Sequence, residues 1–130
     1  MLTRISDVAS DMCSASGIVC EITIPPNLPD VALSDEVRKS LLLIFKEAMN
    51  NIVKHAKATS VSIVTGLSTG ELRLTIADNG TGFSTESSDG SPRGHGLRNM
   101  ARRAEEIGAG FSLRTTPGKG TTIEIVYKMT

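Results

Sequence analysis

The chain has 130 residues, of which 39% are hydrophobic and 22% charged, a composition that suits one globular domain and not two. Lys and Arg together number 14, as do Asp and Glu, and this zero formal net charge argues against broad nucleic-acid binding, which needs a basic surface. No apolar run approaches the roughly 20 residues that span a bilayer, and the N-terminus lacks the apolar region of a secretion signal. Cys13 and Cys20 have neither metal-ligand spacing nor disulfide density, so we expect buried, reduced thiols and a cytosolic environment.

The first half of the chain predicts two helices separated by a strand. Residues 2–16 place apolar side chains on one helical face, and the alternating residues 18–24 predict a strand that stops at Pro25. A long helix follows, with Ser34 as its N-cap and two acidic residues in its first turn. Its predicted apolar stripe consists of Val37, Leu41, Ile44, Phe45, Ala48 and Ile52.

The second half predicts two hairpins and a third helix. Residues 79–96 are rich in Gly and Ser and predict a mobile loop, and a helix over 97–107 ends at Gly108. The result is an α/β (α+β) two-layer sandwich, with three helices on one face of a mixed, mostly antiparallel sheet of about five strands. The strands of the two hairpins are expected over 61–64, 72–76, 111–115 and 121–127.

The long helix carries a polar row beside its apolar stripe. On a wheel of roughly 100° per residue, Glu47, Asn51 and Lys54 fall at the rim of the core, where they could face a cleft beside the sheet. The ordinary alternative is a solvated helix flank with helpful i, i+4 spacing. His55 falls near the middle of the apolar stripe, which is more typical of a packed core histidine than of a ligand.

A carboxylate follows the second strand of the first hairpin. Alternation places Asp78 on the inward side of the sheet, where a carboxylate is costly unless something hydrogen-bonds to it. Gly80 and Gly82 after it permit a tight turn and a close approach to a ligand, and a purine amino group is one donor that would satisfy Asp78. The alternative is a plain β-turn with an Asx-type cap.

Two further features favour a ligand site. Gly94-His95-Gly96 precedes a predicted helix that starts at Leu97. Free backbone amides at the start of a helix attract anions, so this segment could bind one. A flexible linker explains the glycines equally well. Alternation along the last predicted strand points the Thr121 side chain inward, on the same side of the sheet as Asp78. The alternative is an ordinary hairpin in which Thr is simply a common strand residue.

In order and combination, four segments resemble the histidine-kinase branch of the superfamily that includes the gyrase ATPases. They are residues 45–56, which look like the N box, 78–83 and 94–100, which look like the G1 and G2 boxes, and 117–121. The resemblance covers roughly residues 18–127 and implies the Bergerat-type ATP-binding fold over a single domain, 1–130, with an ATP lid at about 84–95. The Glu47/Asn51 pairing looks like the subfamily of kinases that pair with helix-turn-helix response regulators, whereas many other kinases carry Asn at the first of these positions.

The resemblance implies a role for each site residue. Asp78 would accept a hydrogen bond from the adenine amino group with support from Thr121, Asn51 would hold Mg²⁺ between the phosphates, and Glu47 would orient the metal shell or polarise the attacking imidazole. Lys54 would approach the phosphates. The nucleotide-binding set that the resemblance implies is Asn51, Lys54, His55, Asp78, Gly80, Gly82, Phe83, Gly94, His95, Gly96, Leu97 and Thr121.

The implied activity is transfer of the ATP γ-phosphoryl group to a histidine that the chain itself does not supply. Neither His55 nor His95 heads a helix with the acidic neighbour expected of a phospho-acceptor. A dimerisation domain upstream would carry that histidine, a response regulator would receive the phosphoryl group, and the isolated domain would be a monomer of a homodimeric parent. Two alternatives remain: a serine kinase of the anti-sigma-factor type, and a nucleotide-binding module without catalysis.

Overall fold

The fold is a sheet covered by helices on one face, as seen in a computed structural model that describes residues 2–23, 33–56, 58–68, 70–80, 93–116 and 118–128. Within these ranges the side chains at 2–4, 55–56, 68, 93–97 and 116 are not described. The elements are α1 (Leu2–Ser16), β1 (Val19–Thr23), α2 (Asp35–Asn51), the π-helix η1 (Ile52–Ala56), β2 (Ser60–Ser68), β3 (Glu71–Asp78), α3 (Arg93–Glu106), β4 (Gly110–Thr116) and β5 (Gly120–Lys128).

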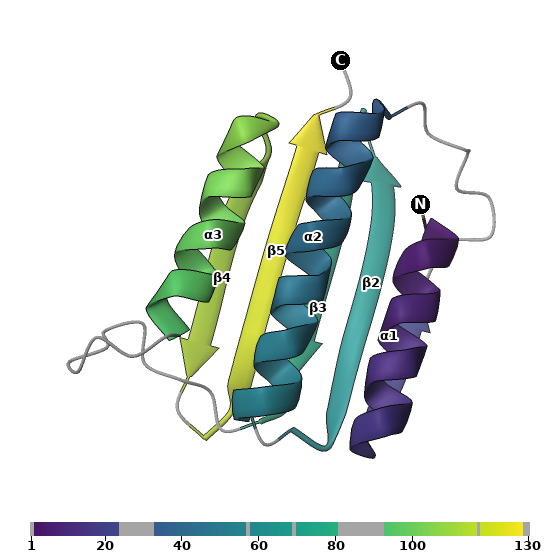
Figure 1. The fold of residues 1–130 in the computed structure, drawn as a ribbon, viewed down its shortest axis with the longest axis vertical. Coiled ribbons are helices and arrows are strands. Elements are labelled where there is room, and N and C mark those ends of the chain that lie inside the picture. Colours follow the sequence, from purple (N-terminus) through teal and green to yellow (C-terminus); the bar gives the residue numbers. More distant parts are fainter. Residues whose placement is uncertain are drawn as a thin grey trace.

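The sheet has the strand order β1-β2-β3-β5-β4, in which β1 and β2 are parallel and every other neighbouring pair is antiparallel. Helices α1, α2 and α3 lie side by side on one face of this sheet (Figure 1). The predicted two-layer sandwich with a mixed, mostly antiparallel five-stranded sheet is therefore confirmed. Both predicted hairpins are present as β2–β3 and β4–β5.

The core lies between the helical layer and the sheet, and the residue patterns of α2 and β3 predict their share of it well. Leu72, Leu74 and Ile76 of β3 alternate with exposed or half-buried neighbours and are all buried. This is the period of two expected of a sheet with one covered face. All six residues of the predicted α2 stripe are buried, with Ile44 and Phe45 at 0% exposure.

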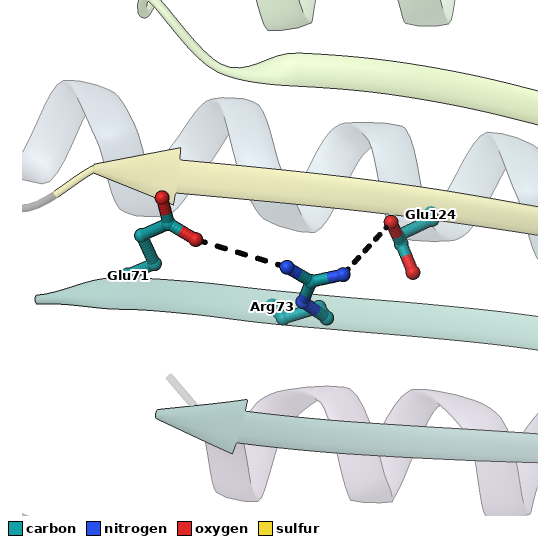
Figure 2. A network of polar contacts seen from close by, with 3 residues as sticks. All are labelled: Glu71, Arg73 and Glu124. Carbon is teal, nitrogen blue, oxygen red and sulfur yellow. Dashed lines mark hydrogen bonds and ion pairs between the residues drawn. The ribbon is translucent and has the colours of Figure 1, made fainter. Parts of the chain in front are cut away.

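The opposite face of the sheet is open and polar. Arg73 lies between two carboxylates there, 3.1 Å from Glu124 and 3.7 Å from Glu71 (Figure 2). The Arg73 side chain is 51% exposed, so water screens both ion pairs. These contacts stabilise the fold far less than the burial of apolar side chains on the other face.

The long helix begins as predicted but ends differently. The Ser34 side chain accepts a hydrogen bond from the backbone N–H of Val37 at 3.2 Å, which confirms the N-cap. After Asn51 the chain continues as the π-helix η1, and the N–H of Ile52 is shared between two carbonyls one turn back. A π-turn takes more residues than an α-turn. The spacing of roughly 100° per residue that predicted Lys54 on the same helix face as Asn51 therefore does not apply beyond Asn51.

The third helix begins at Arg93, four residues before the predicted start at Leu97. Gly94 and Gly96 therefore lie in its first turn and not in a preceding loop. Glycine costs about 1 kcal/mol in a helix interior, but Met100 and Ala104 of the same helix are fully buried, and such packing outweighs a weak local preference. The predicted lid over 84–95 thus overlaps the helix at its end, and residues 84–92 lie outside the described part of the chain.

The cysteines are partly as predicted. Both thiols are free; Cys13 in α1 is buried, whereas Cys20 in β1 is only half-buried. Burial and the neighbouring Cys20 thiol raise the pKa of Cys13 to about 12, so Cys13 stays protonated at neutral pH. Among the described helices, none combines the length and apolar character needed to cross a bilayer.

Candidate functional site

Within the described part of the chain, the residues singled out from the sequence lie toward one end of the molecule. Figure 1 shows that α2 ends, β3 ends, and α3 and β5 begin at the same end of the sandwich. The strand register places Asp78, the last residue of β3, directly opposite Thr121 of β5. The topology thus brings together residues that lie more than 40 positions apart in the chain.

Asp78 is a buried carboxylate, with an exposed fraction of 9%, and it faces the helical layer as its parity predicts. Its Oδ1 accepts a hydrogen bond from the backbone N–H of Gly80 at 2.8 Å. Burial raises the pKa of Asp78, and the nearby backbone N–H groups of Gly80 and Thr121 oppose that rise. A carboxylate can accept about four hydrogen bonds, so the described residues leave Asp78 capacity for a further donor from a ligand.

A pair of hydroxyl groups lies beside Asp78. Thr121 is buried, with 4% exposure, and its Oγ1 lies 3.0 Å from Oγ1 of Thr115, its partner in β4. Sequence reasoning found Thr121 and missed Thr115. The signal was available, because Thr115 shares the inward parity of Thr121 across the hairpin turn, but only the strand register shows that the two face each other.

Gly120 lets the start of β5 lie directly against the turn that follows Asp78. Its φ of +105° is one that L-residues rarely adopt. A Cβ at Gly120 would collide with the carbonyl oxygen of Asp78 and lie 3.1 Å from Cα of Asn79. Only glycine permits this approach, so Gly120 belongs to the site although it carries no side chain.

The helical half of the site has a different character. Glu47 and Asn51 are half-buried, and Lys54 on η1 is exposed. Glu47 faces a shallow groove of about 130 Å³ between α2 and α3, and neither Asn51 nor Asp78 lines it within the described part of the chain. The residues that line the groove are Leu43, Lys46, Glu47, Asn50, Asn99, Met100 and Arg103.

Comparison with known proteins decides the family. Residues 36–130 match the model of the histidine kinase-, DNA gyrase B-, and HSP90-like ATPase family. The chain belongs to this ATPase family. The predicted resemblance to the ATP-binding domain of sensor histidine kinases is thereby confirmed.

The relatives of this ATPase domain are sensor kinases. It is 38% identical over 104 residues to the sensor histidine kinase LiaS of Bacillus subtilis (strain 168), and the match covers 80% of the chain and 28% of LiaS. It is 34% identical over 98 residues to the sensor protein VraS of Staphylococcus aureus (strain COL), covering 75% of the chain and 28% of VraS. The chain therefore spans less than a third of the length of these relatives.

Solved structures support the fold of the ATPase domain. The histidine kinase domain of the Erythrobacter litoralis EL346 blue-light activated histidine kinase has a TM-score of 0.78 at 20% identity, covering 96% of this chain and 59% of that one. Full-length ShkA in complex with AMPPNP has a TM-score of 0.79 at 20% identity, covering 98% of this chain and 30% of that one.

Part of the predicted site lies outside the described residues. Gly82 and Phe83 lie outside the described residues, as do the side chains of His55, His95 and Leu97. The backbone of residues 94–97 forms the first turn of α3, where amide groups have no partner within the helix. An anion could bind those amides, as predicted, but as part of the helix itself and not of a loop before it.

Proposed function

We propose that this domain binds Mg-ATP and transfers the γ-phosphoryl group to a histidine on a separate dimerisation domain of a sensor kinase. One observation carries the proposal: Asp78 is a buried carboxylate at a strand end, and the described residues use only part of its hydrogen-bonding capacity. In a member of this ATPase family, an exocyclic amino group of a purine is the donor that suits such a carboxylate.

The strand end of the site would bind the adenine. Asp78 would accept from the adenine amino group, and the Thr121 hydroxyl, oriented by Thr115, would lie beside it and bind through water. Gly80 and Gly82 would shape the purine pocket, with Phe83 as a further member on resemblance alone. Because the adenine amino group is a donor and the guanine oxygen at the same ring position is an acceptor, a carboxylate there favours ATP over GTP.

The helix end would bind the triphosphate. Asn51 supplies an amide oxygen of the kind that Mg²⁺ accepts as a ligand, and Mg²⁺ would neutralise charge on the phosphates. Glu47 would orient the metal shell or polarise the attacking imidazole, and Lys54, which is exposed and free to reach outward, would approach the phosphates. The first amides of α3 would bind phosphate oxygens, and His55, His95 and Leu97 are proposed neighbours on resemblance alone.

The whole protein would be larger than this chain and would work on the cytoplasmic side, where ATP is available. The sequence contains 2 histidines, His55 and His95, and both fall within segments that we propose to bind the nucleotide, so the acceptor histidine would come from the dimerisation domain. A response regulator with a helix-turn-helix domain would receive the phosphoryl group, and the parent would be a homodimer. The match to LiaS, which leaves most of that sensor kinase uncovered, supports this arrangement.

The test mixes this domain with a histidine-bearing dimerisation domain of a sensor kinase and ATP labelled at the γ-phosphate. Acid-labile, alkali-stable label on histidine is the expected result. Acid-stable label on a serine of an anti-anti-sigma protein would replace the proposal with the serine-kinase alternative. Tight ATP binding with no transfer to either acceptor would leave a nucleotide-binding module.

A further inference from the structure

Asn79, the residue directly after Asp78, uses both ends of its side-chain amide. Its Oδ1 accepts hydrogen bonds from the backbone N–H groups of Thr59 and Ser60, both at 3.0 Å. Its Nδ2 donates to Oγ1 of Thr59 at 2.9 Å. The Asn79 backbone N–H adds a bond to the Ser60 carbonyl at 3.3 Å, so one residue makes four contacts with a segment about 20 positions earlier.

That segment is the connection between η1 and β2. The π-helix η1, which carries Lys54, ends at Ala56, and Ser60 is the first residue of β2. The Thr59 carbonyl also accepts from the backbone N–H of Val19 at 2.9 Å, so the connection is held from both sides. Asn79 therefore links the turn after Asp78 to the connection that follows η1, the helical segment that carries Lys54.

These bonds fix geometry more than they add stability. Asn79 and Thr59 are exposed, and hydrogen bonds at exposed positions replace bonds to water with little net gain. Three bonds from one planar amide nevertheless define both the distance and the angle between the two segments. The amide makes all three at once because it has an acceptor at one end and a donor at the other.

We propose that Asn79 is a positioning residue for the nucleotide: its side chain holds the strand-built end of the site at a set distance from the helix-built end. This inference rests on the proposed function. A ligand that contacts both ends of the site gains from their fixed separation. Once one part of the ligand is bound at one end of the site, its other part is held near the other end at a high effective concentration. A ligand that engages one end alone gains nothing from it.

The test compares three ligands on the whole chain: ATP with Mg²⁺, adenosine, and inorganic triphosphate with Mg²⁺. Asn79→Ala is expected to weaken ATP binding about five- to tenfold while adenosine and triphosphate each change less than about twofold. Calorimetry measures ATP, and displacement of a fluorescent ATP analogue measures the weaker ligands. The decisive quantity is the ratio of the adenosine and ATP dissociation constants.

Two graded variants separate positioning from simple loss of structure. Asn79→Asp keeps an oxygen for the two backbone donors and should restore most of the ATP affinity lost in Asn79→Ala. Thr59→Val removes only the Oγ1 contact and should weaken ATP about twofold, with no further effect when combined with Asn79→Ala. Arg73→Ala, on the open face of the sheet, is the control: it should leave all three ligands unchanged.

The outcomes are distinct. Equal losses for ATP and adenosine would overturn the inference, since Asn79 would then support only the surroundings of Asp78. A lower melting temperature with an unchanged ratio would overturn it as well, because the contacts would be structural only. If Asn79→Ala does not fold, a twofold selective loss of ATP in Thr59→Val supports the inference and an unchanged ratio overturns it. A wild-type chain that binds neither ATP nor adenosine would sink the proposed function itself, and the inference with it.

Discussion

The two ends of the candidate site are built in opposite ways. The strand-built end, around Asp78, Gly120 and Thr121, is buried and held by short contacts within the chain. The helix-built end offers half-buried Glu47 and Asn51 and the exposed Lys54, and no hydrogen bond or ion pair joins these three side chains to other described residues. The strand-built end, proposed to bind the base, is therefore preformed, whereas we expect the helix-built end, proposed to bind the phosphates, to be organised by its ligand.

A preformed end should be the more sensitive to changes in shape, and Gly120→Ala is the strongest test of this. The new Cβ meets the Asp78 carbonyl, and the positive φ is strained for alanine, so we expect a loss of about 3–5 kcal/mol in the free energy of unfolding. Urea denaturation measures it. Gly118→Ala is the matched control, because its φ is also positive but no described atom lies within 4 Å of the added Cβ, and about 1–2 kcal/mol is expected. Equal losses in the two variants would remove the argument from close approach.

The chemistry of the strand-built end is tested by Asp78→Asn. Its side chain keeps the shape of aspartate but replaces one acceptor oxygen and the charge with a donor, which faces the adenine amino group unfavourably. ATP binding should weaken by about 1.5–3 kcal/mol, the usual value of a charge-assisted hydrogen bond. Calorimetry at a temperature where both proteins are folded measures this loss. Unchanged affinity would contradict the adenine assignment.

The helix-built end should respond to metal instead. Asn51→Ala is expected to weaken ATP binding by about 1–2 kcal/mol when Mg²⁺ is present and by little in its absence. The neighbouring Asn50→Ala, which removes an exposed amide of the same helix, is the control and should leave the Mg²⁺ dependence unchanged. Titrations with and without EDTA make the measurement, and a loss of equal size in both would argue against a metal role for Asn51.

The smallest effect is expected far from both ends. Arg73→Ala removes both ion pairs on the open face of the sheet, and because that side chain is half-exposed the fold should lose about 0–1 kcal/mol. ATP affinity should not change. A larger loss of ATP affinity than in Asn51→Ala would show that the two faces of the sheet are coupled. It would contradict the assignment of ATP binding to the two ends of the site alone.

Local patterns in the sequence determined most of the fold. The apolar stripe of α2, the alternation of β3 and the inward direction of Asp78 follow from periods of 3.6 and two residues. The Ser34 cap follows from the ability of a serine side chain to accept from a backbone N–H three residues on. Each depends on neighbours within one or two turns of chain, so a single sequence contains the information. The same patterns, with the resemblance they support, led to the ATPase family before any strand was paired.

Only the tertiary structure determined where two helices end or begin and which segments distant in the sequence are in contact. The π-turn after Asn51 breaks the helical period on which the wheel relies, and α3 begins inside a glycine-rich segment because packing of Met100 outweighs local preference. The contact of Gly120 with the Asp78 backbone and the bonds of Asn79 to Thr59 join segments about 20 to 40 residues apart. Such contacts depend on strand register, which no local period encodes. The sequence therefore identified the buried carboxylate proposed to bind the base, while the fold identified what holds it in place.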